Sequence, residues 1–364
     1  MSLQRGRLQH RRTRSGAGRR LTTATAVALA LAAAACAGEP VKSGGLTPAT
    51  LNASGATFPK VFYEETILEF GLSHPEITVN YAGGGSGKGR TDLQERQVDF
   101  AGSDAPVKEE DVAKYQGGEF VYIPTITAPI TVSFNLDDVD ELRLAPETIA
   151  GIFERDITRW DDPAVAADNP GVELPDTDIT VVRRSDGSGT TENFTKFLVS
   201  AAGEHWSLGS GSTVEWPSDT QGAQGNAGIA GLIQATDGAI GYVDYSDAVV
   251  TGLSFAAVRN RSGAYVLPSP AATSAALAAT TIEEDLTYDP IDADGPDAYP
   301  IAAPTWILVY VEQGDRAKAE ALKAFLRFLL TDGQRLAPEI DYAPLPDELV
   351  GLALAQLDRI EVPA

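Results

Sequence analysis

The segment from Ile179 to Ala201 constrains the fold most, because it passes from a strand pattern to a helix pattern across one short turn. Ile179–Val182 consists of β-branched residues, which favours a strand. After the turn, apolar residues recur at the spacing of one helical face, at Phe194, Phe197, Leu198 and Ala201. The turn, residues 184–190, holds an arginine followed by Ser, Asp, Gly and Thr. Such a turn directs free backbone N–H groups and a guanidinium at a small anion.

Three other turns have the same character and also follow predicted strands. They are Gly55-Ala56-Thr57-Phe58, Gly85-Ser86-Gly87 and Ser103-Asp104. Alternating strands and helices predict a mostly parallel sheet, and the turns at the carboxyl ends of its strands gather where ligands bind. Taken singly, each turn is also consistent with a helix cap or a tight turn. The four turns together, with an arginine, favour a site for an oxyanion.

Asp104 is unusual in such a site, because a carboxylate repels an anion. An ionised Asp only accepts hydrogen bonds, so it suits a ligand that carries a proton. Phosphate keeps at least one proton near neutral pH, whereas sulfate has none. A site built to bind a ligand O–H rejects the analogue without it by about 10⁴–10⁵. The other interpretation of Asp104 is a turn cap before Pro106, while Asp186 is expected to hold Arg184 in place.

The first 35 residues have the features of an export signal. They contain seven arginines and no acidic residue, and Leu21–Ala35 is an apolar run too short to span a bilayer. The run ends at Cys36, the only cysteine of the chain, in a pattern that resembles a bacterial lipoprotein signal. An ordinary cleaved signal with an incidental thiol is the alternative. We expect a signal peptide at 1–35, a lipidated Cys36, a tether at 36–46 and no internal disulfide.

The charge of the exported chain excludes some partners. Without residues 1–35 the chain has 21 basic and 51 acidic residues, which gives a net charge of −30. A nucleic acid needs a basic footprint, so no nucleic-acid partner is expected. The overall field also repels an anion, so local dipoles must hold an anionic ligand. About 315 folded residues exceed what one core supports, so two domains are expected.

Seven motifs, in order over nearly the whole exported chain, carry a family resemblance. They are Gly-Ala-Thr-Phe-Pro (55–59), Gly-Gly-Gly-Ser-Gly (83–87), Val-Asp-Phe-Ala-Gly-Ser-Asp-Ala-Pro (98–106), Val-Val-Arg-Arg-Ser-Asp-Gly-Ser-Gly-Thr (181–190), Gly-Ser-Thr-Val-Glu-Trp-Pro (211–217), Gly-Ala-Ile-Gly-Tyr-Val (238–243) and Asp-Tyr-Ala-Pro-Leu-Pro (341–346). Together they resemble the phosphate-binding proteins of high-affinity phosphate ABC transporters.

The resemblance implies an α/β fold of the type II periplasmic-binding-protein class, with two α/β lobes joined by a two-strand hinge. Lobe I is expected to comprise residues 47–125 plus 300–364, and lobe II residues 126–299. The sequence itself predicts separate strands at Phe120–Pro124 and Ile130–Phe134, on either side of a crossing between the lobes.

The resemblance also implies the residues that bind phosphate. They are Thr57, Phe58, Ser86, Asp104, Arg184, Ser188, Gly189 and Thr190. Asp104 would accept the phosphate proton and Arg184 would make the charge-assisted contacts, while the others would donate backbone N–H or hydroxyl groups. The role of Lys88 stays open. The implied function is delivery of inorganic phosphate to an ABC permease of two membrane subunits and an ATPase, from the outer face of the cell membrane. No cofactor, metal or catalytic residue is expected.

Enzyme interpretations fit the sequence less well. Ala82–Gly89 comes close to a P-loop, but it has Ala82 for the first glycine and Gly89 where a Ser or Thr must ligate Mg²⁺. A serine hydrolase needs a histidine base, and only His74 and His205 follow the signal, without a Gly-x-Ser-x-Gly elbow. The open alternatives are a binder of another oxyanion of the sulfate or molybdate class, a phosphate-sensing lipoprotein and a structural lipoprotein.

Overall fold

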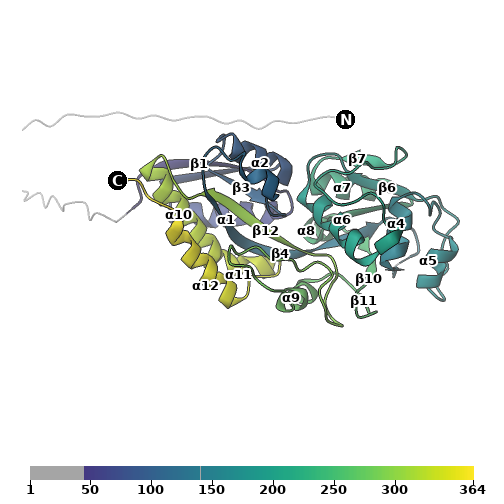
Figure 1. Cartoon of the computed structure of the whole chain (residues 1–364). Coiled ribbons are helices and arrows are strands. Elements are labelled where there is room, and N and C mark those ends of the chain that lie inside the picture. Colours follow the sequence, from purple (N-terminus) through teal and green to yellow (C-terminus); the bar gives the residue numbers. More distant parts are fainter. Residues whose placement is uncertain (1–44, 140) are drawn as a thin grey trace, which may run out of the picture. The chain divides into compact units, whose positions relative to one another are not determined.

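The computed structural model describes residues 45–139 and 141–364 of the chain (Figure 1). The predicted signal at 1–35, Cys36 and the first part of the tether, to residue 44, lie outside the described residues. In the part that the structure describes, no helix combines the length and the apolar character that a membrane span requires.

The main sheet of the described residues has nine strands in the order β2-β1-β3-β12-β4-β8-β6-β7, with β9 beside β4. A smaller sheet has the order β11-β10-β5. The strands are β1 (Ala49–Gly55), β2 (Ile77–Ala82), β3 (Phe100–Ser103), β4 (Phe120–Phe134), β5 (Arg143–Leu144), β6 (Thr180–Arg184), β7 (Gln221–Ala223), β8 (Ala239–Asp244), β9 (Ser254–Phe255), β10 (Ala257–Arg259), β11 (Tyr265–Val266) and β12 (Ala302–Tyr310). In the main sheet β1 is parallel to β2 and β3, and β6 is parallel to β7 and β8.

One long strand, β4, joins the two halves of the main sheet. Phe120–Pro129 pairs with β12, and Ile130–Phe134 pairs with β8 and β9. We call the strands on the β12 side (β1, β2, β3 and β12) half-sheet one, and those on the β8 side (β6, β7, β8 and β9) half-sheet two.

The prediction of two separate strands in this region is wrong. Ile126–Pro129 continues the antiparallel pairing with β12, so Phe120–Phe134 is one strand. Its β-branched residues favour an extended backbone. Pro124 lies beside the register shift between Thr305 and Trp306, and Pro129 is the last residue that pairs with β12 before the pairing passes to β8. The boundaries of the two predicted lobes, after residues 125 and 299, stay a prediction.

The helices are α1 (Lys60–Ser73), α2 (Ser86–Gln94), α3 (Glu109–Val112), α4 (Pro146–Phe153), α5 (Pro163–Asp168), α6 (Gly189–Ala201), α7 (Gly225–Gln234), α8 (Tyr245–Thr251), α9 (Pro270–Ala278), α10 (Arg316–Leu330), α11 (Asp332–Leu336) and α12 (Asp347–Gln356). The predicted change from strand to helix near Arg184 is confirmed, since β6 ends there and α6 begins at Gly189. Phe194, Phe197 and Leu198 of α6 are fully buried, as their helical spacing predicts.

The connections after the parallel strands position the candidate residues. In half-sheet one, Thr57 follows β1, Ser86 follows β2 and Asp104 follows β3. In half-sheet two, residues 185–188 join β6 to α6, and Gln224 joins β7 to α7 (Figure 1). Because β1, β2 and β3 are parallel to one another, as are β6, β7 and β8, the carboxyl ends of each set lie at the same edge of its half-sheet.

Candidate functional site

Asp104, directly after β3, is a buried carboxylate with an unused oxygen. Its side chain is 1 % exposed, and its Oδ2 accepts a 3.2 Å hydrogen bond from the Ser86 hydroxyl. Its Oδ1 is buried and has no hydrogen-bond partner among the described residues. Burial raises the pKa of Asp104 to about 7, although the nearby hydroxyls of Thr305 and Ser86 and the charge of Arg184 oppose the rise. The free oxygen is placed to accept a ligand proton.

Arg184, the last residue of β6, is a buried cation held by the turn that follows it. It is 3 % exposed, and its Nε donates to Asp186 Oδ1 at 2.8 Å while its Nη2 bonds to Asp186 Oδ2. Burial favours a higher pKa for Asp186, but the hydrogen bonds and charge of Arg184 outweigh it and hold that pKa below its usual value. The pair fixes the plane of the guanidinium, as Asp186 was predicted to do.

The N-terminus of α6 supplies donors beside this arginine. Ser188 is the N-cap, and its Oγ accepts from the backbone N–H of Thr191 at 3.1 Å, which leaves the hydroxyl proton free to donate elsewhere. The backbone N–H of Ser188 is bonded to the carbonyl of Ser212 at 2.9 Å. Gly189 and Thr190 form the first turn of the helix, where N–H groups have no partner within the helix.

On the side of half-sheet one, the candidate residues beside Asp104 are Ser86, after β2, and the Thr57–Phe58 pair, after β1. Ser86 is the first residue of α2 and is fully buried, after Gly85 with φ of 89°. Phe58 is fully buried, and its carbonyl accepts from the hydroxyl of Tyr342 at 2.8 Å. Thr57 Oγ1 accepts from the side-chain amide of Asn226 at 3.3 Å, which links it to half-sheet two.

The two half-sheets meet at these residues. The backbone N–H of Gly87 donates to the carbonyl of Gly187 at 2.9 Å, and the Asn193 amide donates to the carbonyl of Asp104 at 2.7 Å. Gly189 approaches so closely that a Cβ there would lie 2.7 Å from Asp104 Oδ2. Half-sheet one thus brings a free carboxylate oxygen, and half-sheet two brings a cation and helix N–H groups, to one buried cluster.

Lys88 does not join the site. Its ammonium group bonds to both carboxylate oxygens of Asp92, at 2.8 and 2.6 Å, one helical turn further along α2. The Lys88 side chain is half exposed and Asp92 is buried, and their i,i+4 spacing on α2 favours such an ion pair.

Sequence reasoning missed Asn226, which is fully buried in the first turn of α7. Its amide contacts Arg184, Thr190 and Thr57. The signal that could have found it is the glycine-containing segment 221–225 directly before it. This segment holds β7 and a further connection between a parallel strand and a helix. The ion pair of Arg90 and Glu192 across the half-sheets was also missed.

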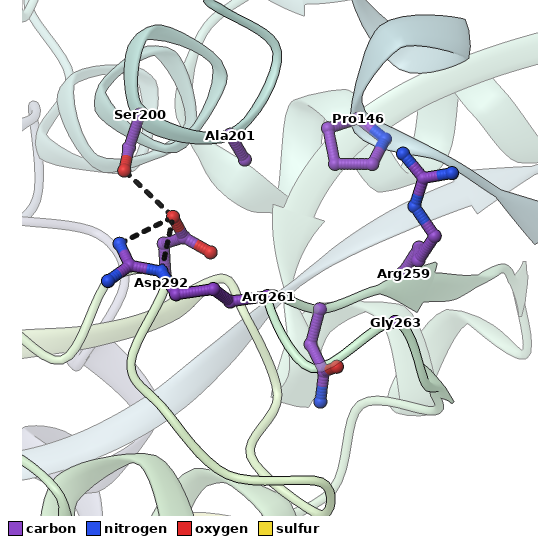
Figure 2. Close-up of a pocket in the computed structure, with 8 residues that line it drawn as sticks. Pro146, Ser200, Ala201, Arg259, Arg261, Gly263 and Asp292 are labelled. Carbon is purple, nitrogen blue, oxygen red and sulfur yellow. Dashed lines mark hydrogen bonds and ion pairs between the residues drawn. The ribbon is translucent and has the colours of Figure 1, made fainter.

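A separate hollow of about 420 Å³ lies away from the candidate residues, none of which lines it (Figure 2). Figure 2 shows Ser200 and Arg261 directed at Asp292, each with a 2.8 Å contact to its carboxylate. Arg259, which also lines the hollow, pairs with Glu147. The charged side chains that line the hollow therefore already have ion-pair partners. Within residues 45–139 and 141–364, no cluster of His, Cys, Asp and Glu is suited to hold a metal ion.

Comparisons with known proteins agree with this geometry. A family profile described as the PBP superfamily domain matches residues 40–333. The phosphate-binding protein PstS of Methanocaldococcus jannaschii is 33% identical over 344 residues, covering 86% of this chain and 87% of that protein. Phosphate-binding protein PstS 3 of Mycobacterium leprae is 32% identical over 326 residues, covering 86% and 85%. The chain belongs to the PstS family of phosphate-binding proteins.

Solved structures agree on the fold of this PstS family member. A high-affinity periplasmic phosphate-binding protein bound with phosphate superposes with a TM-score of 0.71 at 20% identity, covering 84% of this chain and 93% of that chain. The phosphate-binding protein from Stenotrophomonas maltophilia gives a TM-score of 0.66 at 22% identity, with the same coverage. The predicted α/β fold of the type II periplasmic-binding-protein class is confirmed. The named relatives are binding proteins rather than enzymes.

Proposed function

We propose that this protein binds inorganic phosphate where the two half-sheets meet and passes it to an ABC permease. One observation carries the proposal: the buried Oδ1 of Asp104 has no hydrogen-bond partner among the described residues, and Asp104 lies near enough to the buried guanidinium of Arg184 for that charge to lower its pKa. A cation with helix N–H donors suits an oxyanion, and an unused acceptor beside them suits an oxyanion that carries a proton. Phosphate meets both requirements, and the names of the PstS relatives support the same ligand.

The proposed ligand contacts divide between the half-sheets. From half-sheet one, Thr57 and Phe58 donate N–H and hydroxyl groups, Ser86 donates its hydroxyl, and Asp104 accepts the phosphate proton. From half-sheet two, Arg184 donates a charge-assisted hydrogen bond through the Nη2 proton that Asp186 leaves free, and residues 188–190 donate at the N-terminus of α6. For Ser188 we propose the hydroxyl as the donor, because its N–H is bonded to Ser212.

A fully deprotonated oxyanion such as sulfate is the second candidate ligand. It would find the same cation and N–H groups, but the ionised Asp104 would face it with no proton to accept. Desolvated like charges in contact are strongly repulsive, so we propose that Asp104 excludes sulfate.

Export and attachment to the outer face of the cell membrane through a lipidated Cys36 are also part of the proposal. Their support is the N-terminal sequence, with its basic segment, apolar run and single cysteine. Mass spectrometry of Cys36 from membrane fractions checks the lipid. Phosphate uptake by cells that lack the protein distinguishes delivery to a permease from a role in phosphate sensing, since a sensor leaves uptake itself intact.

Calorimetric titration of the purified protein with phosphate, sulfate and arsenate tests the proposed ligand. We expect binding of phosphate and of arsenate, which also keeps a proton, and no measurable binding of sulfate. Arg184→Ala should weaken phosphate binding roughly a hundredfold or more, since it removes the buried cation together with its charge-assisted hydrogen bond. Equal affinities for phosphate and sulfate would overturn the assignment.

A further inference from the structure

The side chain of Asn226 joins three of the proposed phosphate ligands without being one of them. Its Oδ1 accepts from Arg184 Nη1 at 3.2 Å, and its Nδ2 donates to Thr190 Oγ1 at 3.2 Å and to Thr57 Oγ1 at 3.3 Å. Asn226 has no exposed surface. Both protons of the amide are therefore used, and one of its two acceptor sites is occupied.

The orientation of the amide is fixed by its neighbour. A guanidinium only donates, so the amide group that faces Arg184 must be the oxygen. The NH₂ group must then face the two threonine hydroxyls. A reversed amide would set its donors against the donors of Arg184 and would leave both buried groups unsatisfied.

This orientation decides what the two hydroxyls can do. The oxygen of Thr190 receives Asn226 Nδ2 at 3.2 Å and a longer contact from Arg184 Nη1 at 3.5 Å. A hydroxyl has one proton and two acceptor sites, so with its acceptor sites occupied the proton of Thr190 is left to donate elsewhere. Thr57 receives Asn226 in the same way from the opposite half-sheet.

We propose that Asn226 is a positioning residue that turns the hydroxyl protons of Thr57 and Thr190 toward the bound phosphate and steadies the guanidinium of Arg184. The inference rests on the proposed phosphate site and adds to it the reason why two hydroxyls, each able to accept or donate, act as donors there. Because Thr57 lies on half-sheet one and Thr190 on half-sheet two, Asn226 sets this polarity on both sides of the site.

A mutant cycle on phosphate affinity tests the inference. Asn226→Ala is measured by calorimetry in the wild-type protein and in a Thr57→Val, Thr190→Val background that keeps the shape of both side chains but lacks their hydroxyls. We expect Asn226→Ala to weaken binding roughly 10- to 100-fold in the wild type, and far less where no hydroxyl remains to be oriented. Equal losses in both backgrounds would overturn the inference, since a merely structural role costs the same in each.

A second variant, Asn226→Asp, keeps the shape and the contact with Arg184 but reverses the other two hydrogen bonds. A carboxylate only accepts, so each threonine would donate to Asp in place of phosphate. In the wild-type background, we expect Asn226→Asp to lose more phosphate affinity than Asn226→Ala. In the background without hydroxyls, the loss caused by Asn226→Asp should be smaller than in the wild-type background. Wild-type affinity for Asn226→Asp would contradict the inference.

Asn135→Ala is the matched control for the integrity of α7. Asn135 donates to the carbonyls of Ile233, Gln234 and Thr236 at the far end of that helix. We expect it to lower the thermal unfolding temperature without changing phosphate affinity. A wild-type protein that fails to bind phosphate would refute the proposed function, whereas a wild type that binds with no coupling in the cycle would refute only the role of Asn226.

Discussion

The guanidinium of Arg90, on α2, lies 3.1 Å from the carboxylate of Glu192, on α6, and this ion pair joins the two half-sheets. Both side chains are largely buried, at 15% and 16% exposed. Arg90 is held in place by Ser103 Oγ at 3.1 Å. Neither member of the pair is among the proposed phosphate ligands, so the pair holds the half-sheets together independently of the anion.

Glu192→Gln should therefore weaken the contact between the two half-sheets. Losing a partly buried ion pair that joins them is expected to cost about 1–2 kcal/mol, a factor of ~5–30 in phosphate affinity, since phosphate is proposed to bind where the half-sheets meet. Calorimetry measures the affinity, and small-angle X-ray scattering of the ligand-free protein measures the radius of gyration, which should increase. Asp161→Asn, which breaks the exposed pair of Arg159 and Asp161, is the control and should change neither. Unchanged affinity and size for Glu192→Gln would contradict the role of the pair.

Asp186→Asn should destabilise the ligand-free protein more than the phosphate complex. Without Asp186 the buried guanidinium of Arg184 loses its charged partner, at an expected cost of about 3 kcal/mol. Phosphate supplies a replacement negative charge, so the cost shrinks at saturating phosphate. By linkage, the folded variant should bind phosphate at least as tightly as the wild type. Urea unfolding with and without phosphate checks this, and an equal loss under both conditions would refute it.

Asp104 should make the ligand-free protein less stable as the pH rises. Burial raises its pKa from 3.8 to about 7, so the folded state favours the protonated carboxyl. The stability from Asp104 is fully present below pH 3.8 and is lost as the pH rises through about 7, by about 1.4 kcal/mol per unit between these limits.

The comparison with Asp104→Asn isolates this contribution. Burial also raises the pKa values of Asp244 and Asp247. Their titration therefore lowers the stability of both proteins as the pH rises, in the same direction as Asp104. We expect chemical unfolding between pH 4 and 8 to show a shallower decline for Asp104→Asn. Parallel curves for the two proteins would mean that Asp104 does not titrate in this range.

The sequence predicted the parts of this structure that depend on local patterns. The β-branched run before Arg184 and the helical spacing of Phe194, Phe197 and Leu198 define β6 and the buried face of α6. The Ser, Gly and Thr turns were recognisable because helix N-termini need such residues. These local signals, together with the family resemblance, sufficed for the fold class, while the candidate ligands they indicate stay a prediction.

The remaining features depend on contacts that no local pattern contains. The continuity of β4 follows from its pairing with β12, about 180 positions along the chain. The contact of Asn226 with Thr57 spans 169 positions, and an Asn in a first helical turn also fits an ordinary surface position. The bond from the Ser188 N–H to Ser212 likewise appears only when the loop after α6 is folded back.

The most direct test of the account is the ratio of phosphate to sulfate affinity in Asp104→Asn, measured by competition calorimetry at pH 8 beside the wild type. The amide of Asn can donate to sulfate, whereas an ionised Asp cannot. We expect the wild type to discriminate by about 10⁴ or more and the variant to lose most of this discrimination by gaining affinity for sulfate. A variant that still rejects sulfate as the wild type does would contradict the central claim that Asp104 selects the protonated anion.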